Sequence, residues 1–130
     1  MTTFAAIGVL LSLMATGSGV PVQEIEPSPV VWATPSKLEK RADVISAARL
    51  LAAEIRKRNW YPGVPPGCLA YDLESVKGGN YDFAIRFNQA KCGGTSPSNL
   101  MDRARVIKKT GEVLWWNESE FVLPSKRDEM

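Results

Sequence analysis

Apolar residues recur at every third or fourth position from residue 38 to residue 55. This spacing places them on one face of an α-helix, which has about 3.6 residues per turn. Charged residues of the same segment fall mostly on the opposite side. The apolar positions are Leu38, Ala42, Ile45, Ala48, Ala52 and Ile55. The pattern therefore predicts one amphipathic helix.

The predicted helix carries a start signal and a stop signal. Ser36 followed by Glu39 is typical of a capping box, in which each side chain accepts a backbone N–H of the first turn. We therefore expect the helix to begin at Ser36. It should end near Asn59, since Pro62 disfavours helical geometry at Tyr61.

Downstream of the helix the period of apolar residues changes to two, which is typical of strands with one buried face. Residues 80–88 give the clearest example, with aromatic and aliphatic side chains on one face and mostly polar ones on the other. A turn at 75–79 and a hairpin signal at Thr110-Gly111 separate the predicted strands. The further predicted strands are 68–75, 102–109, 112–117 and the short 120–124, with residues 30–32 as a possible edge strand.

The order of these elements predicts the fold class. It is α+β, with one amphipathic helix packed on a four- to five-stranded antiparallel β meander that is held by one disulfide. Such a sheet buries one face under the helix and leaves the other to solvent.

The two ends of the chain differ from the domain between them. Residues 4–14 are apolar and uncharged, and small residues follow, so we interpret residues 1–19 as a secretory signal peptide cut near Gly17 or Gly19. The stretch before the run has no Lys or Arg, which leaves a buried apolar element as the alternative. Residues 20–35 are expected to form an extended arm, 36–124 a single domain and 125–130 a polar tail. This predicts a periplasmic or secreted protein without a membrane anchor after cleavage.

The chain has two cysteines, Cys68 and Cys92. An even count in an exported chain favours a disulfide. Cys68 begins the first strand of a predicted hairpin and Cys92 lies just past the second strand. Both are therefore near the open end of the hairpin, where a bridge is geometrically plausible. Two free thiols in a reducing compartment are the alternative.

The stretch NWYPGVPPGC, residues 59–68, joins the helix to the first long strand. Its prolines stiffen the connection and its glycines permit tight bends. We expect Trp60 and Tyr61 to close the end of the core, since aromatic side chains are more often buried than displayed. An exposed pair that contacts a partner is the alternative.

Several chemistries are excluded or disfavoured by composition. The chain has no histidine, which excludes the Ser-His-Asp triad and histidine metal sites, and we expect no cofactor and no metal. A net charge of +2 gives no reason to expect nucleic acid as a partner. Asp72, Glu74 and Asp82 are expected on one sheet face, where ion pairs across strands, for instance with Arg86, are favoured over a catalytic carboxyl pair. We therefore do not expect an enzyme.

The adjacent Trp115 and Trp116 must point to opposite faces of a strand, so one of them points outward. An outward tryptophan is a good marker of an interface. Arg103 and Arg105 form a basic stripe beside the pair, which could bind an acidic partner or could be an ordinary solvated face.

A small exported α+β domain with one disulfide and no catalytic set resembles small periplasmic inhibitor and immunity proteins. Periplasmic lysozyme inhibitors carry a loop of the form S-G-x-x-Y that enters the lysozyme cleft, and the first hairpin turn here reads Lys77-Gly78-Gly79-Asn80-Tyr81. Lysine stands where those inhibitors have serine, and most of them are barrels with more strands. The hairpin around Thr110-Gly111 also resembles those of PepSY-type periplasmic domains.

The resemblance implies a protein partner, either a cell-wall-degrading enzyme or a secreted toxin. The residues expected to bind it are Lys77, Gly78, Asn80, Tyr81, Trp115 and Trp116, together with the loop 92–99. The alternative is a periplasmic cell-envelope or small-ligand binding module. Such a module should present a concave pocket lined by Trp and Tyr.

Overall fold

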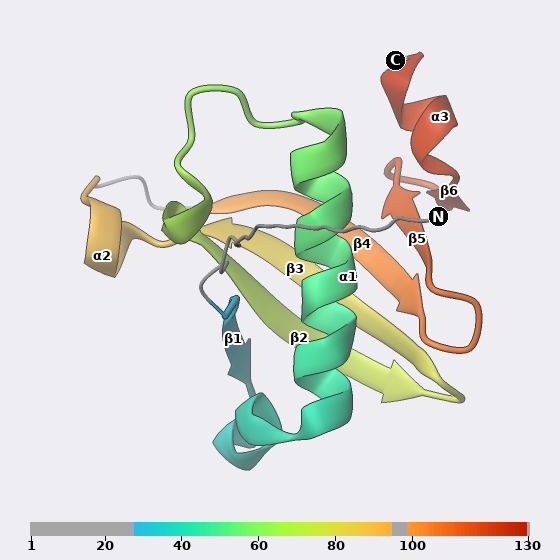
Figure 1. The fold of residues 1–130 in the computed structure, drawn as a ribbon, viewed down its shortest axis with the longest axis horizontal. Coiled ribbons are helices and arrows are strands. Elements are labelled where there is room, and N and C mark those ends of the chain that lie inside the picture. Colours follow the sequence, from blue (N-terminus) through green and yellow to red (C-terminus); the bar gives the residue numbers. More distant parts are fainter. Residues whose placement is uncertain (1–27, 95–98, 130) are drawn as a thin grey trace, which may run out of the picture.

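The computed structural model describes residues 28–94 and 99–129. One long helix, α1 (Ala42–Arg58), lies across one face of a six-stranded sheet (Figure 1). The strands are β1 (Val30–Ala33), β2 (Leu69–Lys77), β3 (Asn80–Phe87), β4 (Leu100–Ile107), β5 (Glu112–Trp116) and β6 (Phe121–Val122). The α+β class is confirmed, and the sheet has slightly more strands than the four or five predicted.

The strands lie in the sheet in the order of the sequence. Strands β2 to β6 form an antiparallel meander, as predicted, whereas β1 pairs in parallel with β2 at the edge. The additional strand is thus β1, at the edge of the sheet. Prolines that flank an edge strand do not interrupt the pairing of the central strands.

The described part of the chain also contains four short helical elements. They are the 3₁₀ turns η3 (Ser36–Lys40) and η4 (Pro66–Cys68), and the single-turn helices α2 (Gln89–Cys92) and α3 (Pro124–Asp128). In Figure 1, α2 and α3 lie at opposite margins of the fold, and Asp128 of α3 pairs with Arg58 of α1.

The predicted start of the main helix is wrong by six residues. Ser36 opens η3 instead, and its side chain makes no capping hydrogen bond. Arg41 then adopts an extended backbone (φ −68°, ψ 133°), so α1 begins at Ala42. The Glu39 carboxylate accepts the Ala33 N–H at 3.3 Å, which ties η3 to β1 rather than closing a capping box. The predicted end is confirmed, with Asn59 in the left-handed conformation (φ 50°) that asparagine tolerates.

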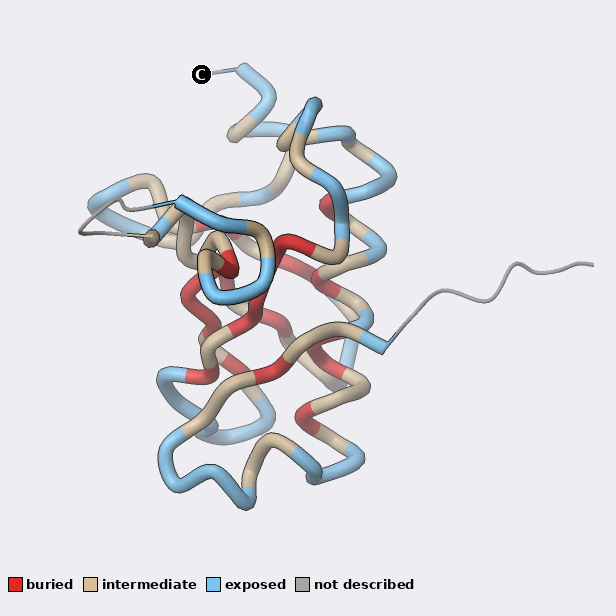
Figure 2. Tube along the Cα trace, turned by 90° about the vertical axis from the view of Figure 1, so that its left-hand side faces the viewer, coloured by how far each residue is buried: buried red, intermediate tan, exposed pale blue. Residues whose placement is uncertain are grey.

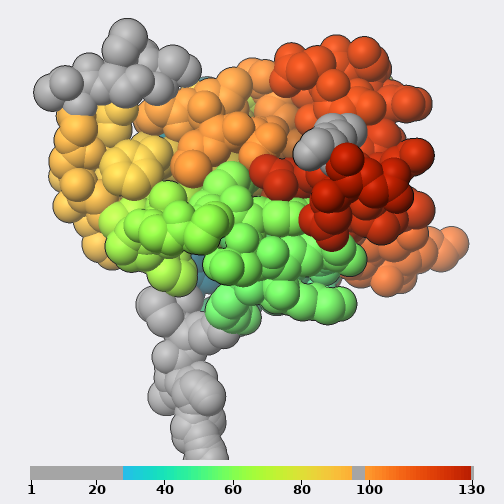
Figure 3. Space-filling model, turned by 90° about the horizontal axis from the view of Figure 1, so that it is seen from above, coloured from blue at the N-terminus to red at the C-terminus, as the bar shows by residue number. Residues whose placement is uncertain are grey.

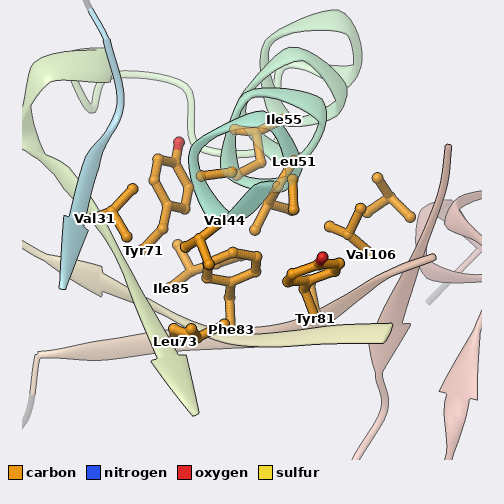
Figure 4. Close-up of a cluster of buried hydrophobic side chains, with 14 of the residues drawn as sticks. Val31, Val44, Leu51, Ile55, Tyr71, Leu73, Tyr81, Phe83, Ile85 and Val106 are labelled. Carbon is orange, nitrogen blue, oxygen red and sulfur yellow. The ribbon is translucent and has the colours of Figure 1, made fainter. Parts of the chain in front are cut away.

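The core lies between α1 and the inner face of the sheet. Buried stretches alternate with exposed turns along the tube of Figure 2, and Figure 4 shows strand side chains that point toward Val44, Leu51 and Ile55 of the helix. Phe83 and Ile85 at its centre have no exposed surface. The alternation predicted for residues 80–88 therefore placed the core strand correctly.

The turn between β2 and β3 is tighter than predicted. Strand β2 continues to Lys77, so the loop consists of Gly78 and Gly79 alone. Both have positive φ, 59° and 82°, which is the condition for the two-residue hairpin turn whose twist matches that of the strands. An irregularity in the pairing between Leu73 and Ser75 precedes the turn.

The chain end departs from the polar tail expected at 125–130. It folds into α3, and Figure 3 shows the C-terminal residues packed beside α1. The Arg127 guanidinium lies 4.3 Å from the centre of the Trp60 ring and 5.2 Å from that of Trp115. The polar sequence gave no sign of this packing. An arginine can cover aromatic surface with its side chain while its charge stays near water.

Cys68 and Cys92 form the predicted disulfide, with Cα atoms 5.8 Å apart. Within the described residues no helix is long and apolar enough to cross a membrane. The predicted signal peptide and most of the predicted arm lie outside the described residues.

The first turn of α1 holds a carboxylate that should make stability depend on pH. The Asp43 carboxylate accepts hydrogen bonds from the Arg41 guanidinium at 2.6 Å and from the Tyr81 hydroxyl at 2.7 Å. These contacts hold the pKa of Asp43 well below its ordinary value of 3.8. A lowered folded-state pKa stabilises the fold fully above the ordinary value, and this contribution is lost as the pH falls below it.

We therefore expect Asp43→Asn to lower the free energy of unfolding at neutral pH and to flatten its decline between about pH 5 and pH 2. Urea titrations at a series of pH values measure this, with the exposed Glu112→Gln as the matched control. Parallel curves for Asp43→Asn and the wild type would show that this carboxylate does not contribute.

Candidate ligand-binding cavity

A cavity of about 470 Å³ opens between α1, the start of β1, the start of β2 and the 59–67 connection. Its lining is predominantly apolar, with a few polar groups, which is the usual composition of a small-molecule site. Its lining residues are Ser28, Pro29, Val30, Arg49, Ala52, Ile55, Arg56, Asn59, Tyr61, Gly63, Val64, Pro66, Gly67, Leu69, Tyr71 and Lys91.

The floor of the cavity consists of core residues. Ile55, Leu69 and Tyr71 each expose less than a tenth of their surface. In Figure 4 the Tyr71 ring stands between Val31 and α1, with its hydroxyl directed away from the centre of the core. Burial raises the pKa of Tyr71 to about 12, partly offset by the positive charge of Arg56. The phenol is therefore a neutral hydrogen-bond donor at physiological pH.

The mouth of the cavity is basic. Arg49 and Arg56 come from α1 and Lys91 from α2, and all three are exposed. Among the described residues of the lining, not one is Asp or Glu. The Arg49 guanidinium donates to the Ser28 hydroxyl at 3.0 Å, and within the described residues it has no carboxylate partner. The electrostatic potential at the mouth is therefore positive.

One wall is the connection that the sequence presented as a joint. Tyr61, Val64 and Gly67 line the cavity, and a turn closed by the Val64 N–H and the Tyr61 carbonyl at 3.0 Å shapes the wall. Gly63 in this turn has φ 86°, a conformation that favours glycine. The stretch therefore joins α1 to β2 and also forms a surface that a ligand can contact.

The disulfide holds two sides of the cavity together. Gly67 and Lys91 both line it, and each directly precedes a bridged cysteine. The Asn88 side chain accepts the Lys91 N–H at 3.3 Å, which fixes the turn that carries the lysine. The bridge therefore sets the distance between the connection and α2.

The end of the core beside the cavity is closed by aromatic residues, as predicted for Trp60 and Tyr61. Trp60 packs edge to face on Trp115, with ring centres 4.0 Å apart. The Tyr61 hydroxyl donates to the Asp102 carboxylate at 2.5 Å, and burial together with this carboxylate raises the pKa of Tyr61. Arg127 also donates to Asp102, at 3.0 Å. A smaller hollow of about 280 Å³ lies here, but its acid and base already pair with each other.

The six residues predicted to bind a partner do not form one surface. Lys77 and Gly78 are exposed at the β2–β3 turn and Asn80 is half-buried there. Tyr81 is buried, and its hydroxyl donates to Asp43. The remaining two are the tryptophans of β5, which is two strands away from β3 in the sheet.

The tryptophan pair splits between the two faces of the sheet, as the alternation requires. Trp115 is buried in the core and Trp116 lies on the outer face, with its ring centre 5.0 Å from that of Phe121. Trp116 is thus the member of the pair that remains available to a partner. Burial leaves Trp115 no free surface for one.

The outer face carries ion pairs between strands, as predicted from the alternating charges. Arg86 pairs with Asp72 at 2.9 Å, Arg105 with Asp82 at 2.7 Å and Arg103 with Glu74 at 3.0 Å. The predicted basic stripe is therefore largely neutralised by its neighbours. These carboxylates are solvated and paired, unlike the buried acid that a glycosidase needs.

Sequence reasoning missed the residues that make the cavity. Tyr71 follows the period-two pattern of the predicted strand 68–75, which indicates only that its side chain is buried. In the sequence, Arg49 and Lys91 look like ordinary surface charges. Only Lys91 carried a signal, because it adjoins a bridged cysteine. Among the described residues no cluster of His, Cys, Asp and Glu could hold a metal ion.

Searches of protein-family models, of curated proteins and of solved structures find no match to this chain.

Proposed function

We propose that this chain is an exported binding domain and that the cavity beside α1 receives a small ligand. The observation that carries the proposal is the cavity itself, with its apolar floor, its phenol and its basic mouth. A volume of about 470 Å³ lies within the range of small-molecule sites, about 300–1,000 Å³.

The chemistry of the side chains supports binding rather than catalysis. No histidine is present in the sequence, and both cysteines are bridged, so neither a histidine base nor a thiolate is at hand. The described residues of the cavity lining include no carboxylate to act as an acid or a base. Selective binding requires only the shape and the few polar groups that the cavity offers.

Two features support a location outside the cytoplasm, in the periplasm or the secreted fraction. The apolar run at residues 4–14, followed by small residues, is typical of a signal peptide. The Cys68–Cys92 bridge is consistent with an oxidising compartment.

Ala52→Phe should abolish the binding of an uncharged apolar probe such as N-phenyl-1-naphthylamine. Ala52 lines the cavity from α1, so the added ring occupies the space that the probe requires. We expect at least about tenfold weaker binding, which corresponds to roughly 1.4 kcal/mol. Fluorescence titration measures it, and thermal unfolding monitors the cost of overpacking.

The matched control is Ala53→Phe, the same change on the next residue of α1, which is exposed. It should bind the probe like the wild type. Equal affinities for Ala52→Phe and Ala53→Phe, or no saturable binding by the wild type, would remove the cavity as the site.

A second candidate function is that of an inhibitor of a cell-wall-degrading enzyme or an immunity protein against a secreted toxin. The observation that favours it is the exposed turn Lys77-Gly78-Gly79-Asn80, where a Cβ added at either glycine would meet nothing within 4 Å. A bare backbone turn at the end of a hairpin can approach a partner closely.

For this second function the double variant Lys77→Ala/Asn80→Ala should weaken binding to a lysozyme by more than about 1 kcal/mol. Stability should change by less than about 0.5 kcal/mol, because the turn is at the surface. Inhibition of lysozyme turnover and urea titration measure the two quantities. The double variant Lys40→Ala/Glu54→Ala, with one change in η3 and one in α1, is the control, and loss of inhibition only in that control would place the partner on this helical side.

A further inference from the structure

We propose that the ligand of the cavity carries an anionic head group, a carboxylate or a phosphate, on an apolar body. This inference rests on the proposed function and names the chemical class that the cavity recognises. Three features carry it, namely the charge at the mouth, the hydrogen-bond donor at the floor and the apolar walls.

Two cations at the mouth differ from the arginines outside the cavity in their ion pairing. Six arginines outside the cavity lining each contact a carboxylate: Arg41, Arg58, Arg86, Arg103, Arg105 and Arg127. Within the described residues, by contrast, neither Arg49 nor Lys91 pairs with a carboxylate, although each lines the cavity. Two cations at one opening without a carboxylate partner in the described part of the chain attract an anion and repel a cation.

The floor offers a donor and no acidic acceptor. The Tyr71 hydroxyl makes no hydrogen bond with the described residues, although the side chain is buried. The nearby positive charge of Arg56 favours a negatively charged oxygen at this place. The hydroxyl is not fully enclosed, since Trp115 Nε1 is the enclosed side-chain polar atom that lacks a partner among the described residues. A ligand oxygen that enters the cavity can therefore reach the phenol and accept a hydrogen bond from it.

The walls fix the other half of the ligand. Ala52, Ile55, Val64 and Leu69 present aliphatic surface between the mouth and the floor. Apolar surface that a ligand buries here contributes in proportion to its area. The combination selects a short-chain amphiphilic anion over inorganic phosphate, which has nothing to bury against these walls.

The test is calorimetric titration of the mature protein with eight-carbon probes that differ in the head group alone. These are octanoate, octyl phosphate, 1-octanol and octylammonium. The two anions should bind at least about tenfold more tightly than octanol, which is the lower end of the gain from one hydrogen bond to a charged group. Octylammonium should bind most weakly, and the relative affinity of octanoate and octyl phosphate identifies the preferred head group.

Variants then locate the charge. Lys91→Gln and Arg49→Gln should each lower the affinity for the preferred anion toward that of octanol and leave octanol unchanged. Lys91→Glu should bring octylammonium above octanoate. Lys109→Gln, an exposed lysine in the turn between β4 and β5, is the matched control and should change nothing.

The outcomes separate the two proposals. If octanol binds as tightly as both anions and the charge variants have no effect, the ligand class is wrong while the cavity remains a binding site. If octylammonium binds best to the wild type, the ligand class is likewise wrong. If no probe of any charge binds while the wild type is folded, the proposed function fails together with the inference.

Discussion

Phe83→Ala should lower the free energy of unfolding by about 3–5 kcal/mol, the usual cost of deleting a buried aromatic side chain. Phe83 lies at the centre of β3 with no exposed surface, beneath the residues of α1 that cover the sheet (Figure 4). The truncation removes apolar contacts and leaves a cavity that a close-packed core only partly fills by relaxation. Urea titration monitored by tryptophan fluorescence measures the loss.

The matched change is Phe121→Ala, which removes the same ring from the half-exposed outer face. It stacks with Arg105 at 4.2 Å, so a smaller loss of about 0.5–1 kcal/mol is expected. Equal losses in the free energy of unfolding for Phe121→Ala and Phe83→Ala would contradict the assignment of the core to the inner face of the sheet.

Removal of the disulfide by the double variant Cys68→Ala/Cys92→Ala should cost about 3.5 kcal/mol by the chain-entropy relation for a loop of this size. The bridge spans a sequence separation of 24 residues and restricts the unfolded chain accordingly. Because typical domains have about 5–15 kcal/mol of stability, this loss is a large fraction of the total. Urea titration with and without a reductant measures it.

In that titration the wild type treated with reductant should approach the double variant, and the double variant itself should not respond to reductant. The double variant should also bind the apolar probe less tightly, since the bridge holds Lys91 beside Gly67, where the lysine Nζ would lie 3.3 Å from a Cβ added at the glycine. Unchanged stability on reduction would show that the bridge contributes nothing to the fold in solution.

Much of the architecture was predictable because it follows local periodicity. The alternation at residues 80–88 identified the central strand, and the pattern from residue 38 to residue 55 identified the helix. The start of the helix was not predictable, since Ser36 and Glu39 satisfy the capping pattern but the Glu39 carboxylate accepts the N–H of Ala33 in β1 instead. Parallel pairing of β1 with β2 is a long-range choice that local sequence does not specify.

The cavity was harder to predict than the fold. It arises where β1, α1, a proline-rich connection and α2 meet, so residues as far apart in the sequence as Ser28 and Lys91 line it. Arg49 lies on the polar side of an amphipathic helix, where periodicity predicts only a solvated charge. Tyr71 follows the alternation of a buried strand, which gives no sign that its hydroxyl faces a space. Sites of this kind depend on packing geometry that periodicity alone does not contain.

The most direct test of the ligand site is a nuclear magnetic resonance titration of the mature, uniformly ¹⁵N-labelled protein with octanoate. The account predicts saturable shifts of the backbone amides that surround the cavity, with the largest at Ala52, Leu69, Tyr71 and Lys91. Amides of the outer face, such as those of Arg105 and Trp116, should not shift. Saturable shifts confined to the outer face or to the turn at Gly78 and Gly79 would contradict the account.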